Sequence, residues 1–234
     1  MSGYWAVVPA AGSGTRMNAS LPKQYLPLLG RPLIECTLER LASVPEITGI
    51  MVAIAGDDVH WSGIRLPAHV EVLTVSGGAE RHLSVLNALR ALRGRVPDND
   101  WVLVHDAARP CVHPDDIRKL ISSLRDHPVG GLLGIPVADT MKRVEAGGAV
   151  TGSVDRAGLW HALTPQMFRL RALIEAIERA GAGPCAITDE ASAVEYTGLR
   201  PLMVAGRRDN IKVTTAGDLK LAEQFLRSQE EEGT

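Results

Sequence analysis

The chain has 234 residues, of which 45% are hydrophobic and 22% are charged, and its formal net charge is −2 at pH 7. This composition is typical of globular proteins and excludes the disordered and collagen-like classes. Because the charges nearly balance, they give no reason to expect nucleic acid or an anionic membrane as a partner. At this length, residues 1–234 are expected to form one α/β domain.

The cysteine spacing and the lengths of the apolar runs indicate in which cellular compartment the protein is expected. Cys36, Cys111 and Cys185 are widely spaced and form no Cys-x-x-Cys pair, so neither a disulfide framework nor a zinc ribbon is indicated. The apolar run at residues 4–8 has no basic segment before it and ends too early for a signal peptide. Since no other stretch is long enough to cross a bilayer, we predict a soluble, cytoplasmic protein.

Short runs rich in Val, Ile and Leu alternate with segments of helical period along the chain. The runs predict strands at residues 4–8, 50–55, 70–75, 101–105 and 131–135. The helical segments are residues 32–42, 80–92, 114–124, 169–180, 189–196 and 216–226. Several strands are apolar at nearly every position, as expected for strands covered on both faces. This order predicts βαβ units and a mainly parallel central sheet flanked by helices.

The last of these helices has a start signal and an acidic tail. Thr215 and Asp218 are spaced as in a capping box, which predicts that the helix begins at residue 216. The tail, residues 229–234, is rich in Glu, and we expect it to be frayed.

One segment departs from the βαβ rhythm. Residues 139–144 and 150–155 are short extended runs that flank a glycine-containing turn, which predicts a β-hairpin within residues 137–158. A two-stranded hairpin is marginally stable in water on its own. We therefore expect it to pack against something else, such as a second subunit.

The first predicted strand leads into a glycine-rich segment, residues 9–17, PAAGSGTRM. Gly12 and Gly14 allow backbone N–H groups to approach an anion closely. The segment is neither a Walker A motif nor the dinucleotide fingerprint, because it lacks Gly-Lys-Ser/Thr and has methionine at the position of the third glycine. Arg16 and Lys23 follow it, and the two cations together could hold a triphosphate. The alternative is a simple turn with two solvated surface cations.

A second candidate site lies at the end of the strand at residues 101–105. Asp106 follows this strand, and Arg109 comes three residues later. In open α/β sheets ligands gather at the carboxyl ends of strands, and a carboxylate there suits Mg²⁺, with Arg109 on a phosphate. The alternative is that Asp106 caps the next turn and pairs with Arg109. Lys212, which follows a glycine turn, could face either solvent or the site.

The histidines show no metal-ligand spacing, and no Ser/His/Asp arrangement is evident. Zinc chemistry and triad hydrolysis are therefore not indicated.

Taken together, the motifs closely resemble the family of 2-C-methyl-D-erythritol 4-phosphate cytidylyltransferases over the length from Trp5 to Leu226. The motifs are PAAGSGTRM (9–17), PKQ (22–24), GGAER (77–81), HDAARP (105–110), TMKR (140–143), DR (155–156), TPQ (164–166), TDEA (188–191) and NIKVT (210–214). The resemblance implies a Rossmann-like nucleotidyltransferase fold with a protruding β-hairpin dimerisation arm. It also implies reaction of CTP with the sugar-alcohol phosphate, release of pyrophosphate, and a homodimer whose arm reaches into the partner.

The resemblance assigns a role to each matching position. The CTP site takes Ala10, Ala11, Gly12, Gly14, Gly78 and Ser84, the last two as cytosine readers. The catalytic cations are Arg16, Lys23 and Lys212, and Asp106 is both the Mg²⁺ ligand and a substrate contact. The sugar-alcohol phosphate is contacted by Arg109, Thr164 and Lys212, with Thr140 and Arg156 supplied across the dimer.

This reaction needs no general base, because a phosphate monoester has a second pKa of about 6 and carries a nucleophilic oxyanion at neutral pH. Three other functions compete with it. The nearest is a cytidylyltransferase that uses ribitol 5-phosphate. A Rossmann-fold dehydrogenase is less well supported, because the glycine-rich segment has methionine at the position of the third glycine of the dinucleotide fingerprint. A non-catalytic nucleotide sensor would bind CTP without releasing pyrophosphate.

Overall fold

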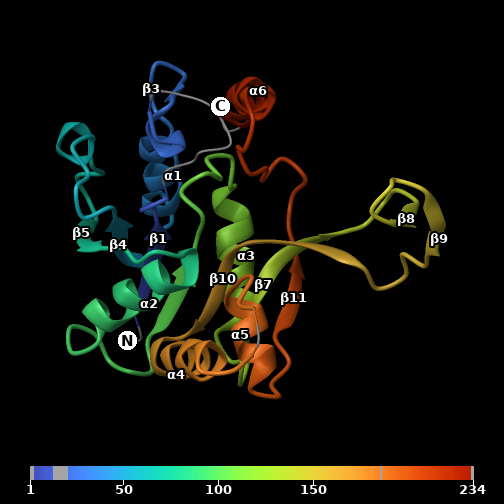
Figure 1. Ribbon diagram of the computed structural model, residues 1–234. Coiled ribbons are helices and arrows are strands. Elements are labelled where there is room, and N and C mark those ends of the chain that lie inside the picture. Colours follow the sequence, from blue (N-terminus) through green and yellow to red (C-terminus); the bar gives the residue numbers. More distant parts are fainter. Residues whose placement is uncertain (1–2, 13–20, 185, 233–234) are drawn as a thin grey trace.

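A seven-stranded sheet forms the centre of the protein, which is a computed structural model describing residues 3–12, 21–184 and 186–232 (Figure 1). The strands in spatial order are β11 (Leu202–Ala205), β7 (Gly130–Pro136), β10 (Trp160–Arg169), β6 (Trp101–Val104), β1 (Tyr4–Pro9), β4 (Ile47–Ile54) and β5 (Glu71–Ser76). Neighbouring strands pair in parallel, except that β10 is antiparallel to both β6 and β7. The mainly parallel α/β sheet is therefore confirmed.

Helices cover both faces of this sheet. They are α1 (Leu33–Ala42), α2 (Arg81–Leu92), α3 (Pro114–Leu124), α4 (Leu170–Gly181) and α5 (Glu190–Tyr196), whereas α6 (Ala216–Glu232) packs in a smaller, separate cluster with residues of α1 and the loop after β6. Alternate residues of β1 point to opposite faces: Val8 packs in one core with residues of α1 and α3, and Val7 packs in the other with residues of α2 and α4. Burial on both faces explains why β1 is an almost continuous apolar run.

Two sheet strands lie outside the predicted runs. β10 contains Pro165 among polar residues, and its pairing with β7 shifts register between Ala162 and Gln166. A proline inside a run argues against a strand, so this segment carries a weak strand signal. β11 has only four residues. The chain also contains smaller elements. Between β1 and α1 these are η2 (Lys23–Tyr25), β2 (Pro27–Leu28) and β3 (Arg31–Pro32), and between β4 and β5 there is η3 (Trp61–Gly63).

The start of α6 agrees with the prediction, but its end does not. The Thr215 N–H donates to Asp218 Oδ2 at 2.8 Å, and the Asp218 N–H donates to Thr215 Oγ1 at 3.3 Å, so the capping box is present. The predicted frayed tail is wrong for residues 229–232, because α6 continues to Glu232. The reason is a tertiary anchor: the buried amide of Gln229 donates to the carbonyl of Cys111 at 3.0 Å and to Asp209 at 2.8 Å.

Replacing Gln229 by alanine is expected to lower the free energy of unfolding by about 1–3 kcal/mol, because the buried carbonyl of Cys111 loses its donor. Urea denaturation followed by circular dichroism measures the change. Gln224→Ala, at an exposed position of the same helix, is the control and should change stability by less than about 0.5 kcal/mol. Equal stabilities of the two variants would contradict the anchor.

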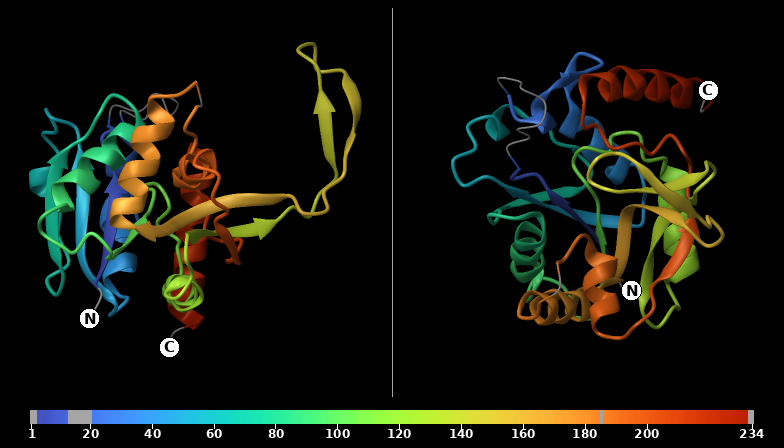
Figure 2. Two further views of the ribbon diagram at one scale, coloured as in Figure 1. Left: turned by 90° about the horizontal axis from the view of Figure 1, so that it is seen from below. Right: turned by 45° about the vertical axis from the view of Figure 1, so that its right-hand side comes forward.

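A hairpin arm extends from the body of the molecule (Figure 2). β8 (Met141–Val144) and β9 (Val150–Val154) pair only with each other, and the Val137 N–H to Leu159 carbonyl bond continues the β7–β10 pairing into the arm. All residues of β8 are exposed. The predicted hairpin is confirmed, and within the described residues its faces are not covered by the rest of the chain.

Among the residues described, no helix combines the length and the apolar character needed to span a bilayer.

Candidate functional site

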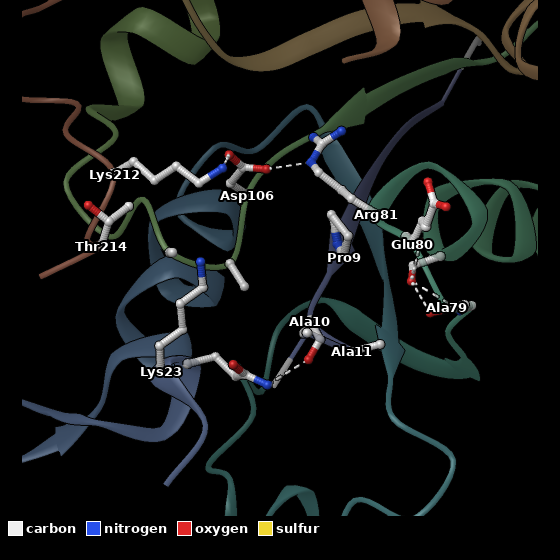
Figure 3. A pocket seen from close by; sticks show the side chains of 16 residues that line it. Pro9, Ala10, Ala11, Lys23, Ala79, Glu80, Arg81, Asp106, Lys212 and Thr214 are labelled. Atoms are coloured by element: carbon white, nitrogen blue, oxygen red, sulfur yellow. Dashed lines mark hydrogen bonds and ion pairs between the residues drawn. The ribbon is translucent and has the colours of Figure 1, made fainter. Parts of the chain in front are cut away.

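A cavity of about 550 Å³ opens at the carboxyl ends of β1, β5 and β6 (Figure 3). It is lined by Pro9, Ala10, Ala11, Gly12, Lys23, Gln24, Gly78, Ala79, Glu80, Arg81, Ser84, Asp106, Ala107, Ala108, Lys212 and Thr214. Parallel strands end at one edge of a sheet, and the loops that follow them therefore meet there. The structure thus brings the described members of the predicted CTP site together with Lys23, Asp106 and Lys212.

The remaining predicted site residues are not among the described residues that line the cavity, although Arg109 and Thr164 both contact Asp106. Gly14 and Arg16 lie outside the described residues. Thr140 precedes β8 and Arg156 follows β9, so both belong to the exposed arm and neither lines the cavity of its own chain. Arg156 donates to the carbonyl of Ala138 within the arm.

The turn η2 places Lys23 at the cavity. The buried Gln24 donates from Nε2 to the carbonyl of Ala10 at 2.7 Å, and the hydroxyl of Tyr25 donates to Asp58 at 2.6 Å. These two contacts fix the turn against the glycine-rich segment and the loop after β4. Figure 3 shows Lys23 extending from this turn into the cavity.

The wall opposite Lys23 is formed by the loop from β5 to α2. The Gly78 N–H donates to Ser84 Oγ at 3.0 Å, so the two predicted cytosine readers are in contact. Gly77 belongs to this loop and lies against the glycine-rich segment at Ala11. A Cβ atom at Gly77 would lie 2.3 Å from the Cβ of Ala11 and 2.9 Å from Ser84 Oγ, and only glycine fits there without a shift.

Asp106 is the centre of the charges around the cavity. It is 7% exposed, and its Oδ1 accepts from Arg81 Nε at 2.9 Å while its Oδ2 accepts from Lys212 Nζ at 2.8 Å. Arg109 Nε lies 3.6 Å from the same Oδ2. Burial would raise the pKa of Asp106, but the three cations hold that pKa far below its ordinary value. Asp106 is therefore ionised at neutral pH.

Arg81 was not among the predicted site residues, although it lies in the motif at residues 77–81. Its Nη1 and Nη2 atoms donate to the two oxygens of Glu190 at 2.7 and 3.1 Å. Burial alone would lower the pKa of Arg81, but Glu190 and Asp106 raise it. Both residues occur in motifs of the sequence, yet they are 109 positions apart, and nothing in either motif indicates that they touch.

A buried hydrogen-bond chain holds the backbone of Asp106. Its N–H donates to Thr164 Oγ1 at 3.1 Å, and that hydroxyl lies 3.0 Å from Nδ1 of His105. His105 Nε2 lies 3.0 Å from the carbonyl of Arg109. Because burial lowers the pKa of His105 to about 4, the ring is neutral at pH 7. Its Nε2–H then donates to Arg109 and its Nδ1 accepts from Thr164. The predicted phosphate contact of Thr164 stays a prediction.

Lys212 is placed by backbone contacts to the loop after β6. The Val213 N–H donates to the carbonyl of Ala108 at 2.8 Å, and Arg109 Nη1 donates to the carbonyl of Asn210 at 2.7 Å. These bonds hold the segment that carries Lys212 beside Asp106, as Figure 3 shows. Lys212 therefore faces the site, which the sequence left open.

The described residues contain no cluster of three or more His, Cys, Asp or Glu side chains that could hold a metal ion. The buried carboxylate of Asp106 lies at the cavity among several cations, next to glycine-rich backbone, whereas Glu80, another carboxylate of the lining, is exposed. This arrangement suits a polyanion and a cation that bridges it to the protein. It does not suit a cation held by the protein alone.

A family model described as 2-C-methyl-D-erythritol 4-phosphate cytidylyltransferase matches residues 4–228. The chain belongs to this family. A cytidylyltransferase of that name from Pseudomonas putida is 49% identical over 222 residues, 94% of each chain. Another from Vibrio vulnificus is 51% identical over 226 residues, covering 97% of this chain and 95% of the relative.

Solved structures of the same family are similar to this chain. The 2-C-methyl-D-erythritol 4-phosphate cytidylyltransferase of Francisella tularensis has a TM-score of 0.82 and 35% identity, covering 96% of this chain and 100% of its own. A crystal structure of a 4-diphosphocytidyl-2C-methyl-D-erythritol synthase has a TM-score of 0.83 and 33% identity, with 97% and 100% coverage. The predicted family and its nucleotidyltransferase fold are confirmed, and the chain is a cytidylyltransferase.

Proposed function

We propose that this cytidylyltransferase transfers the cytidylyl group of CTP to 2-C-methyl-D-erythritol 4-phosphate and releases pyrophosphate. The observation that carries this is the combination of relatives at about 50% identity over nearly the whole chain with a cavity built from the family motifs. The relatives give no support to the alternative acceptor, ribitol 5-phosphate.

The proposal assigns CTP to the cavity at the strand ends. Gly78 and Ser84 are the groups for the cytosine, and the glycine-rich segment with Lys23 receives the triphosphate. Arg109 and Lys212 are the cations for the acceptor phosphate. An oxyanion of the acceptor phosphate forms a bond to the α-phosphorus of CTP, the bond from that phosphorus to its bridging oxygen breaks, and pyrophosphate leaves with the electron pair. The cations align the anions and stabilise the developing charge.

We propose that Asp106 holds a Mg²⁺ ion when the nucleotide is bound. Mg²⁺ in nucleotide sites takes one or two carboxylates and completes its coordination with phosphate oxygens and water, which fits the buried, ionised carboxylate of Asp106. The ion would neutralise phosphate charge. Lys212 and Arg81 occupy both oxygens of Asp106 in the structure, and transfer of Lys212 to the acceptor phosphate would make Oδ2 available.

We also propose a homodimer formed through the arm. Met141, Val144 and Val150 are 37%, 56% and 60% exposed on the two arm strands. Apolar side chains on a projecting hairpin are the kind of surface that a partner covers. A partner's arm is also the source that would bring Thr140 and Arg156 to the cavity. The cytoplasmic location stays a prediction.

The function is tested by measuring pyrophosphate release with 2-C-methyl-D-erythritol 4-phosphate and each of the four nucleoside triphosphates, with Mg²⁺ or with EDTA. We expect release with CTP and Mg²⁺ only. Equal turnover with ribitol 5-phosphate would contradict the assigned acceptor. Binding of CTP that leads to no pyrophosphate release with either acceptor would favour the nucleotide sensor.

Gly77→Ala is expected to weaken CTP binding about tenfold, because the new methyl group must displace Ala11 or Ser84 and so separate the two walls of the nucleotide site. Isothermal titration calorimetry measures the dissociation constant. Gly63→Ala is the control, since its Cβ atom would meet nothing within 4 Å. An unchanged affinity for CTP in Gly77→Ala would show that this contact does not shape the site.

Arg156→Ala is expected to raise the KM for the sugar-alcohol phosphate more than the KM for CTP, because this arm residue is assigned to the acceptor. Steady-state kinetics in both substrates measures the split. Arg143→Ala, another exposed arginine of the arm, is the control. A proportional rise of both KM values would contradict the assignment.

Mixing subunits tests whether the arm acts across a dimer. Lys23→Ala chains are expected to be nearly inactive, and so are Arg156→Ala chains when the sugar-alcohol phosphate is kept well below their raised KM. In a mixed dimer one site has Lys23 from one chain and Arg156 from the other, so random mixing should restore about a quarter of the wild-type activity. Activity that stays at the level of the separate variants would contradict a shared site.

A further inference from the structure

Glu190 is a buried carboxylate that the proposed reaction does not use. It is 1% exposed, it begins α5, and it binds both Nη atoms of Arg81. The Nε of the same guanidinium donates to Asp106 at 2.9 Å. One guanidinium therefore joins two carboxylates that come from separate segments of the fold, and one of these carboxylates faces the cavity.

The geometry of the guanidinium decides what Arg81 offers to Asp106. The group is planar, and its donors are arranged so that a carboxylate can accept two parallel bonds. Glu190 takes such a pair of bonds, and only Nε–H remains directed at Asp106. Asp106 thus keeps Oδ2 clear of Arg81, and Lys212 and Arg109 are the cations near that oxygen.

The distribution of charge also indicates that Arg81 interacts more strongly with Glu190 than with Asp106. The cation of Arg81 is neutralised mainly by the fully buried Glu190, because two bonds join them against one to Asp106. If Glu190 lost its charge, the guanidinium could turn its two-donor edge to Asp106 and would compete with any other cation for both oxygens.

We infer that Glu190 is a positioning residue that acts through Arg81 to keep Asp106 available to the divalent cation. This inference rests on the proposed function, in which Asp106 holds Mg²⁺ beside CTP. It assigns a role to a residue that does not line the cavity, and it predicts an effect on the metal requirement rather than on nucleotide binding.

The test is Glu190→Gln, with two readouts. The Mg²⁺ concentration that gives half-maximal turnover is expected to rise about tenfold, as for other residues that orient a metal ligand. The dissociation constant of CTP measured by calorimetry without metal is expected to stay the same or fall, because the cavity gains net positive charge next to a triphosphate. A merely structural role would weaken both.

The double variant Arg81→Gln/Glu190→Gln distinguishes this mechanism further. It removes both charges, leaves no buried ion unpaired, and removes the cation that competes for Asp106. Its half-maximal Mg²⁺ concentration is expected to return to within about threefold of the wild type. A requirement as high as that of Glu190→Gln would overturn the inference.

Glu190→Asp provides the measurement if Glu190→Gln does not fold. It keeps the buried charge but is one methylene shorter, so the paired contact with Arg81 is lost, and the Mg²⁺ requirement should rise about threefold. Glu178→Gln is the matched control. Its side chain accepts from Arg90 of α2 at 2.7 Å on the exposed surface, and both readouts should stay within about twofold of the wild type.

Metal binding is also measured without turnover, by electron paramagnetic resonance of Mn²⁺ added to the CTP complex. Weaker Mn²⁺ binding in folded Glu190→Gln supports the inference, whereas an unchanged Mn²⁺ affinity or an unchanged Mg²⁺ requirement overturns it. If the wild-type protein released no pyrophosphate, the proposed function would fail, and the Mn²⁺ affinities would still decide the role of Glu190.

Discussion

Replacing Lys23 by alanine is expected to lower kcat by about two to three orders of magnitude. The reason is that the variant lacks a preorganised cation that would stabilise the negative charge developing on pyrophosphate. Lys23 extends into the cavity from η2, and this turn is fixed by Gln24 and Tyr25. The variant should therefore keep its fold. Steady-state kinetics and thermal unfolding measure the two expectations.

Lys220→Ala, at an exposed position of α6, is the matched control for the loss of one positive charge. It should retain the wild-type kcat. A folded Lys23→Ala protein with nearly normal turnover would remove Lys23 from the catalytic groups. Arg16→Ala is expected to resemble Lys23→Ala in its kinetics, since the family resemblance places both cations on the triphosphate.

Asp106→Asn is expected to lower kcat by about two to three orders of magnitude and, unlike Lys23→Ala, to strengthen CTP binding measured without metal. The carboxylate is proposed to hold Mg²⁺, so its loss removes the ion from the site. The same change leaves Arg81, Lys212 and Arg109 without their shared anion next to the triphosphate. Turnover assays at several Mg²⁺ concentrations and calorimetry with CTP in EDTA measure these opposite effects.

The control for Asp106→Asn is Asp116→Asn, which changes a carboxylate of similar burial that accepts from the Arg207 N–H, away from the cavity. It is expected to affect stability and not the Mg²⁺ requirement. If Asp106→Asn lost affinity for CTP in EDTA as well, the three cations would not be acting on the nucleotide, and the proposed arrangement of charges would be wrong.

The cavity residues that follow predicted strands could be located from the sequence. Ala10 and Asp106 each come within two residues of the end of an apolar strand, and ligand sites in α/β proteins collect at these strand ends. Local patterns also predicted the hairpin and the start of α6. In each case the information lies within a few residues of the chain, where spacing and turn chemistry act.

The sequence did not indicate the contact between Arg81 and Glu190, the bond that the Asp106 N–H donates to Thr164, or the anchor at Gln229. These partners are 109, 58 and, for Gln229 with Cys111, 118 positions apart. Such pairs depend on which loops the sheet order brings together.

Alternating apolar and helical segments therefore determined the class of fold, and the motifs determined the family and several of the residues that line the cavity. Only the tertiary structure decided that Lys212 faces the site and that three cations share one carboxylate. It also decided that the arm carries Thr140 and Arg156 away from the cavity of their own chain. The physical reason is that local patterns are governed by neighbours in the chain, whereas the charge balance of a site is governed by neighbours in space.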